Sequence, residues 1–171
     1  MKEIFRYGLV LALICMIAAG LLATVNSFTK AKILAQGQKE EEVGLREVMP
    51  EAFQFEPIKS QTGEILYYKA SDKEGRPVGI VFKAEGKGYS STITTLVGMR
   101  DDFSISAIKI LSQNETPGLG ARVSEEDFAG QFKNKKDLND VCAITGATIS
   151  SKAVIEAVKK KVEEIKGLIK Q

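Results

Sequence analysis

The first feature of the hydrophobic pattern is an uncharged run near the amino terminus, from Tyr7 to Val25. As a helix its 19 residues would be about 28 Å long, close to the roughly 30 Å hydrocarbon core of a bilayer. The run therefore predicts one membrane-spanning helix. The alternative is a cleaved signal peptide, with Lys2 and Arg6 as its basic start and Ala23 near the cleavage point. The run is longer than a usual signal core, which favours a retained anchor.

A charged segment with recurring apolar positions follows the run. Between Asn26 and Met49 no cluster of turn residues interrupts the chain. This pattern predicts a helix that leaves the bilayer. Pro50 is expected to end it, because a residue before proline is disfavoured in the helical conformation.

Five short stretches with the residue pattern of strands occupy the middle of the chain. They cover residues 53–58, 64–71, 78–84, 90–99 and 104–111. Turn-forming residues such as Gly86-Lys87-Gly88 separate them. The expected arrangement is an antiparallel meander.

Two helices are predicted after the strands. The loop 113–122 holds two glycines and a proline and is expected to be irregular, and a short helix from Ser124 to Phe132 should follow with Ser124 as its N-cap. The last helix, 151–169, has apolar residues at helical spacing, which predicts one packed face. These apolar positions are Val154, Ile155, Val158, Val162, Ile165 and Ile169. A sheet packed with helices gives an α+β fold class.

Composition narrows the chemistry that this chain can perform. Its 171 residues suffice for one domain beside a membrane segment, and 24 basic against 22 acidic residues leave a net charge of only +2. This small net charge creates no large positive field that would attract nucleic acid, so nucleic acid is not expected as a partner. The chain has no histidine and two cysteines, of which Cys15 lies in the apolar run. We therefore expect no metal site and no catalytic residue, and redox chemistry would need an organic cofactor.

Small and hydroxylated residues, ITGATISS at 144–151, stand directly before the predicted last helix. A helix N-terminus has unpaired N–H groups and a partial positive charge, so a phosphate gains hydrogen bonds and a favourable field there. Gly146 and Ala147 leave room for such a group. On spacing alone, a simple N-cap by Ser150 or Ser151 is the favoured explanation of the run.

Residues 145–148, TGAT, resemble the flavinylation motif of FMN-binding domains in the Rnf and sodium-pumping NADH:quinone oxidoreductase complexes. In that family a transferase uses FAD to esterify FMN phosphate to the last threonine of the motif, which maps onto Thr148. The loop 115–120, ETPGLG, resembles a second family motif that lies against the flavin. The implied FMN contacts are Thr145, Gly146, Ala147, Thr148, Ile149, Ser150 and Ser151 in the first motif, and Glu115, Thr116, Pro117, Gly118, Leu119 and Gly120 in the second.

Together with the single anchor, the two motifs make the resemblance cover essentially the whole chain. The length of the chain is closer to that of the Rnf G subunit than to that of the longer, homologous subunit of the sodium-pumping complex. It implies an electron-transfer subunit of a ferredoxin:NAD oxidoreductase complex, with FMN on Thr148, membrane and iron–sulfur subunits as partners, and a flavin transferase during maturation. The implied division is a cytoplasmic start and lipid-embedded anchor at 1–28, a helical connector at 29–49, and an extracytoplasmic FMN-binding domain at 50–171 of a bacterial inner-membrane protein. Charge leaves the orientation open, because basic residues flank both ends of the run. Two other interpretations are a stand-alone tethered FMN carrier or reductase and a tethered binding domain without cofactor.

One residue departs from the family pattern. Many members have an aspartate two residues before the isoleucine that precedes the TGAT motif, where this chain has Cys142. We expect Cys142 to be a small buried side chain without a redox role, and we expect the transferase to modify the chain regardless.

Overall fold

The computed structural model describes residues 2–60 and 63–169. Met1, in the expected anchor 1–28, and residues 170–171, in the expected domain 50–171, lie outside the described residues. The chain divides into two compact units, the first up to Glu40 and the second from Glu41 onward. A single helix, α1 (Lys2–Val48), contributes to both units. Within the described ranges it is the one helix whose length and composition allow it to cross a membrane, although a signal sequence passes the same test.

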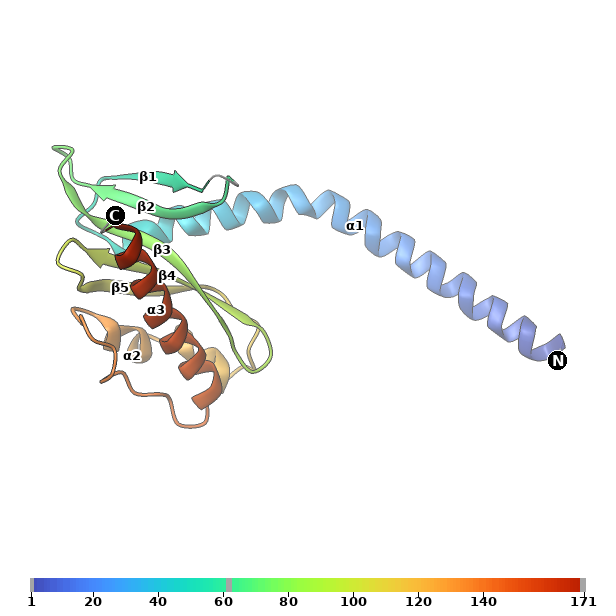
Figure 1. Cartoon of the computed structure of the whole chain (residues 1–171). Helices are drawn as coiled ribbons and strands as arrows, with labels where there is room; N and C mark the ends of the chain where they lie inside the picture. The colour runs from blue at the N-terminus through green and yellow to red at the C-terminus, as the bar shows by residue number, and fades with distance from the viewer. Residues whose placement is uncertain (1, 61–62, 170–171) are drawn as a thin grey trace. The chain divides into compact units, whose positions relative to one another are not determined.

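The second unit contains a five-stranded antiparallel sheet whose strands neighbour one another in chain order (Figure 1), so the predicted meander is confirmed. Short turns connect consecutive strands, as the turn residues indicated. The strands are β1 (Gln54–Lys59), β2 (Ile65–Ser71), β3 (Pro77–Lys87), β4 (Thr92–Arg100) and β5 (Ile105–Ser112).

Both faces of the sheet are covered by helical residues. Successive side chains of a strand point to opposite faces, so one strand contributes to both cores. On one face, Phe82 of β3 belongs to a core that includes Val158 of α3 (Thr148–Ile169). On the other face, Val81 packs in a second cluster with Leu45 and Val48 from the last turns of α1. The expected α+β architecture is therefore present, with helical residues on each side of one sheet.

The packed unit begins at Glu41, before the boundary at residue 50 expected from the sequence. The hydroxyl of Tyr68 donates a 2.6 Å hydrogen bond to Glu41, and the Lys83 ammonium lies 2.7 Å from the same carboxylate. Burial, together with this hydrogen bond and the charge of Glu41, raises the pKa of Tyr68. The end of α1 is thus fastened to the sheet by both apolar and polar contacts.

The expected single helix from Ser124 to Phe132 is wrong. Three short pieces replace it: η1 (Gly120–Ser124), α2 (Glu126–Ala129) and η2 (Gly130–Phe132). Glu125 precedes α2, and no side-chain hydrogen bond caps that helix. Phe128 and Phe132 are buried edge to face with ring centroids 5.4 Å apart, so burial of these rings rather than capping organises the segment.

Candidate functional site

The TGAT motif forms a tight turn followed at once by helix α3. The N–H of Ala147 donates to the carbonyl of Ile144 at 3.0 Å, and Gly146 at the third turn position has φ +83°. This is the geometry of a type II turn, which requires positive φ at that position and therefore favours glycine. Thr148 is the first residue of α3 and is exposed. The turn thus presents a threonine hydroxyl at a helix N-terminus.

The helix begins three residues earlier than expected, so the idea that Ser150 or Ser151 is its N-cap is wrong. Both serines lie inside the first turn and are buried. The Ser151 hydroxyl donates to the Ala147 carbonyl at 2.8 Å and accepts the Ile144 N–H at 3.1 Å, which fixes both ends of the turn. The side chains of both serines point to the packed face of α3, and that of Ser151 holds the turn at residues 144–147 from the interior.

The second motif contains a turn of the same kind. The N–H of Leu119 donates to the Thr116 carbonyl at 3.1 Å, with Pro117 second and Gly118 third at φ +74°. The two turns are neighbours, because a Cβ placed on Gly146 would lie 3.9 Å from a methyl group of Leu119. The fold therefore brings together the two motifs that the sequence singled out.

Glu115 joins three segments through its buried carboxylate. One oxygen accepts the Ser150 hydroxyl at 2.5 Å and the Tyr89 N–H at 3.1 Å. The other accepts the N–H groups of Ser90 at 3.0 Å and Ser91 at 2.9 Å, and the Ser91 hydroxyl at 3.3 Å. Both oxygens are thus engaged within the protein, and Glu115 acts by fixing the β3–β4 turn and the start of α3 against the loop.

The electrostatics of Glu115 follow from these contacts. Burial by itself would raise its pKa, but the hydrogen bonds from Ser150, Ser91, Ser90 and Tyr89 outweigh burial and lower the pKa from 4.5 to about 2. The carboxylate is therefore ionised at neutral pH. Neutral donors stabilise its charge, and each such charge-assisted bond is stronger than a neutral one.

Exposed apolar side chains flank the motif. Tyr89, Ile149 and Leu119 keep 73%, 57% and 52% of their surface accessible. Tyr89 was missed by the sequence reasoning, because its backbone reaches the site through Glu115, 26 residues away, and no local pattern signals that contact. Ile149 follows Thr148 in the chain and Leu119 lies beside Gly146, so both place exposed apolar side chains at the motif, and the Tyr89 backbone is joined to the same site through Glu115.

Two cations lie near the motif. Arg122 donates to the Thr145 carbonyl at 3.5 Å and is 3.4 Å from Glu125, while Lys152 is exposed one helical turn beyond Thr148. Thr145 itself is exposed. The guanidinium thus braces the turn, and the ammonium adds positive charge to the first turns of α3.

One of the two cysteines, Cys142, lies in different surroundings from those expected. Cys142 is exposed, so the expectation of a buried side chain is wrong; its N–H donates to the Gln131 side chain at 2.9 Å, which holds the backbone at the surface. Cys15 is exposed on α1. Across residues 2–60 and 63–169, no three His, Cys, Asp or Glu side chains cluster in a metal-binding arrangement.

Comparison with known proteins places these motifs in a family. Residues 88–163 match the family model of the FMN-binding domain, and residues 1–48 match that of the RnfG N-terminal region. The G subunit of the ion-translocating oxidoreductase complex of Methanosarcina acetivorans is 33% identical over 96% of this chain and 95% of its own length. The G subunit of the proton-translocating ferredoxin:NAD(+) oxidoreductase complex of Clostridium ljungdahlii is 34% identical over 96% and 92%.

A crystal structure of the C subunit of the Na(+)-translocating NADH-quinone reductase from Parabacteroides distasonis is 26% identical, covers 56% of this chain and 58% of its own, and has a TM-score of 0.48. The whole-length relatives are subunits of ion-translocating oxidoreductase complexes, and the family model assigns an FMN-binding domain to this chain. The chain belongs to the family of G subunits of ion-translocating oxidoreductase complexes.

Proposed function

We propose that this chain is an electron-transfer subunit of a membrane-bound, ion-translocating ferredoxin:NAD oxidoreductase complex of the Rnf type, and that it carries FMN as a phosphoester on Thr148. The observation that carries the proposal is the exposed Thr148 hydroxyl, held at the first residue of α3 directly after a type II turn. It lies within the segment that matches the FMN-binding domain.

The site fits a phosphoester at this position. The first N–H groups of a helix have no intrahelical acceptor, and the dipole favours an anion there by about 0.3–1 kcal/mol. The hydroxyls of Ser150 and Ser151 are used internally, so backbone N–H groups of the first turn and Lys152 are the groups that would hold the phosphate. Gly146 and the small, buried Ala147 keep bulk away from the hydroxyl.

The exposed apolar residues would receive the rest of the cofactor. FMN supplies the redox chemistry when bound, and Tyr89, Leu119 and Ile149 would contact its ring. During maturation, the Thr148 oxygen would replace AMP at the FMN phosphorus of FAD, and its proton would pass to a base of the flavin transferase.

The same proposal includes location and partners. Residues 1–28 would anchor the chain in the lipid of the bacterial inner membrane in a single pass. Residues 29–49 would connect this anchor to the domain, and residues 50–171 would bind FMN outside the cytoplasm. Other membrane and iron–sulfur subunits of the complex would exchange electrons with it. The membrane-spanning role is supported by the apolar part of α1 and by the match to the RnfG N-terminal region.

The test is the intact mass and flavin fluorescence of the denatured chain after coexpression with a flavin transferase. Wild type and Thr148→Ser are expected to carry one FMN each, since either hydroxyl can form the ester. Thr148→Val should carry none. Thr92→Val is the matched control, because it removes an exposed threonine hydroxyl outside both motifs and should keep FMN. An FMN mass on the valine variant at 148 would overturn the attachment site.

The complex is tested separately. Copurification of the flavinylated chain with membrane and iron–sulfur subunits supports the Rnf-type role. A flavinylated chain that is active alone with an extracellular acceptor would instead indicate a stand-alone carrier or reductase. An unmodified, colourless chain would indicate a binding domain without cofactor.

A further inference from the structure

The two edge strands of the sheet are protected to different degrees. β1 carries Glu56, Pro57 and Lys59, and charges and proline are the usual devices that stop an edge from pairing with another chain. β5 reads ISAIKILS, with Lys109 as its one charge, and that charge is paired with Glu47 at 2.6 Å. The β5 edge therefore lacks the protection that β1 has.

Much of the outer edge of β5 is open. Ile105 exchanges two backbone hydrogen bonds with residues 134–135, its N–H donating to Lys135 at 2.8 Å and its carbonyl accepting from Asn134 at 2.7 Å. Beyond Ile105, no backbone hydrogen bond reaches this edge from any other segment that the structure describes. Residues 107–110 pair regularly with β4 between two register shifts, so about 14 Å of straight edge is available.

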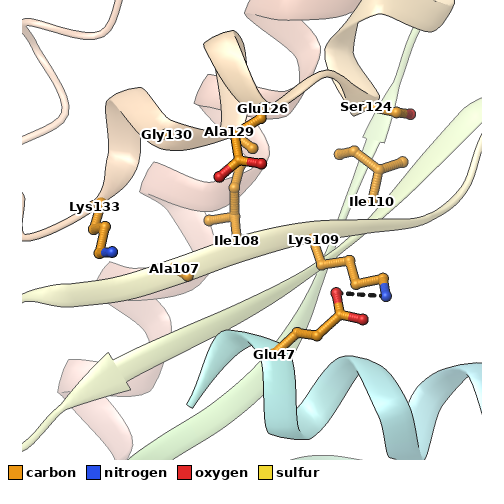
Figure 2. A pocket seen from close by; sticks show the side chains of 10 residues that line it. All are labelled: Glu47, Ala107, Ile108, Lys109, Ile110, Ser124, Glu126, Ala129, Gly130 and Lys133. Atoms are coloured by element: carbon orange, nitrogen blue, oxygen red, sulfur yellow. Dashed lines mark ion pairs between the residues drawn. The ribbon is translucent and has the colours of Figure 1, made fainter. Parts of the chain in front are cut away.

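A groove of about 420 Å³ follows this edge (Figure 2). Residues 107–110 of β5 form its floor, Glu47 of α1 lies on one side, and Ser124, Glu126 and Lys133 lie on the other. In Figure 2, Lys109 points toward Glu47, whereas Ile108 and Ile110 point toward the α2 side. Residues from the two layers that cover the sheet thus both line the groove beside its last strand.

We propose that this groove binds an extended segment of another subunit of the complex, which adds a sixth strand beside β5. This inference rests on the proposed function, because that function supplies the complex. An open row of N–H and C=O groups is satisfied best by another extended backbone, since helices use their backbone groups internally. The occupant is therefore a strand-forming peptide.

The charges of the groove define the occupant further. Glu126 and Lys133 line one wall, and neither has an ion-pair partner in the portion of the chain that the structure covers. A segment with a basic side chain beside Glu126 and an acidic one beside Lys133 complements both. Such complementarity sets direction and register, and a like charge placed opposite either residue would oppose docking.

The experiment uses the full chain in the purified complex. A photoreactive p-benzoylphenylalanine replaces Ser124 in the groove wall, and in a control replaces Lys73 in the β2–β3 turn. Crosslinks are mapped by mass spectrometry, and amide exchange of residues 107–110 is compared between the complex and the isolated chain. We expect a crosslink from position 124 to a segment of another subunit, none from position 73, and at least tenfold slower exchange in the complex.

Charge reversal supplies an independent measurement. Glu126→Lys should lower recovery of the partner subunit at least tenfold, whereas Asp127→Lys, on the same helix but outside the groove, should leave it unchanged. The FMN mass is measured on every sample, so failure of flavin attachment is distinguished from failure of docking. Equal exchange rates in both states, a crosslink only to a second copy of this chain, or equal recovery of both variants would overturn the proposal.

Discussion

The hydroxyl of Ser150 donates a 2.5 Å hydrogen bond to the carboxylate of Glu115, across 35 residues of sequence. Ser150 stands two residues after the exposed Thr148, and Glu115 opens the ETPGLG loop. Because the same carboxylate accepts three N–H groups from the β3–β4 turn, one buried charge fixes three segments around the motif. The geometry of the exposed surface therefore depends on an interior contact.

The first prediction concerns pH. The folded pKa of Glu115 is about 2 and the unfolded value is 4.5, so the unfolded state binds a proton first as the pH falls. The stability contributed by the ionised form, at most about 3 kcal/mol, is present above pH 4.5 and is lost between about 4.5 and 2. Urea denaturation followed by tyrosine fluorescence should show the advantage of wild type over Glu115→Gln shrinking in this range. Parallel pH profiles for the two proteins would contradict this.

The second prediction separates two glycines of one loop. A Cβ on Gly120 would lie 2.7 Å from both the Glu115 carboxylate and the Ser150 hydroxyl, so Gly120→Ala should cost about 1–3 kcal/mol and disturb the flavin spectrum. Gly118 has positive φ but open space around it, and asparagine tolerates that conformation, so Gly118→Asn should cost less than about 1 kcal/mol. Denaturation midpoints and absorption spectra measure both. If Gly120→Ala and Gly118→Asn lost the same amount of stability, crowding at Gly120 would be unimportant.

The third prediction concerns truncation. A chain that starts at Lys30 keeps Leu45, Val48 and Met49, all buried in the second cluster, and should fold as a soluble flavoprotein when exported with the transferase. A chain that starts at Pro50 loses all three. At about 1.5–3 kcal/mol each, their loss approaches the whole stability of an ordinary domain, so this chain should be unfolded. Circular dichroism and proteolysis distinguish the two, and a stable fold from Pro50 would refute the role assigned to the end of α1.

The fourth prediction concerns Cys142, which stands where the resemblance described above leads us to expect aspartate. The exposed thiol leaves the turn and the Thr148 hydroxyl undisturbed, so wild type, Cys142→Ser and Cys142→Asp should all carry FMN after coexpression with the transferase. The intact mass of each of the three proteins shows whether it carries FMN. FMN on the aspartate variant alone would mean that the motif of this chain is defective.

The sequence predicted the sheet well because alternation and turn residues are local signals. Five strands were expected within three residues of their observed ends, and their order followed from the short connections. The start of α3 was misplaced by three residues, because Thr148 follows a type II turn and no capping pattern precedes it. Ser150 and Ser151 resemble caps in sequence, yet the packing of that turn directs them inward.

Long-range contacts explain what the sequence could not supply. Glu115 was singled out as a cofactor contact, but its partners lie 24 to 35 residues away, and nothing in ETPGLG indicates that the β3–β4 turn binds it. Tyr89 was missed for the same reason. The packing of Leu45 and Val48 against the sheet was also hidden, because their spacing in α1 resembles that of any helix that continues from a membrane span.

The exposure of Thr148 contrasts with the burial of the groups that hold it. Under the proposed attachment of FMN to Thr148, this contrast would make folding and modification separate events. Glu115, Ser150 and Ser151 complete their hydrogen bonds within the polypeptide, so the proposed attachment site needs no cofactor contact to hold its shape. A chain can then be synthesised, moved to its compartment and kept as a folded precursor. On the proposal that FMN is attached to Thr148, supply of flavin, rather than supply of protein, would then limit how many electron carriers a cell has.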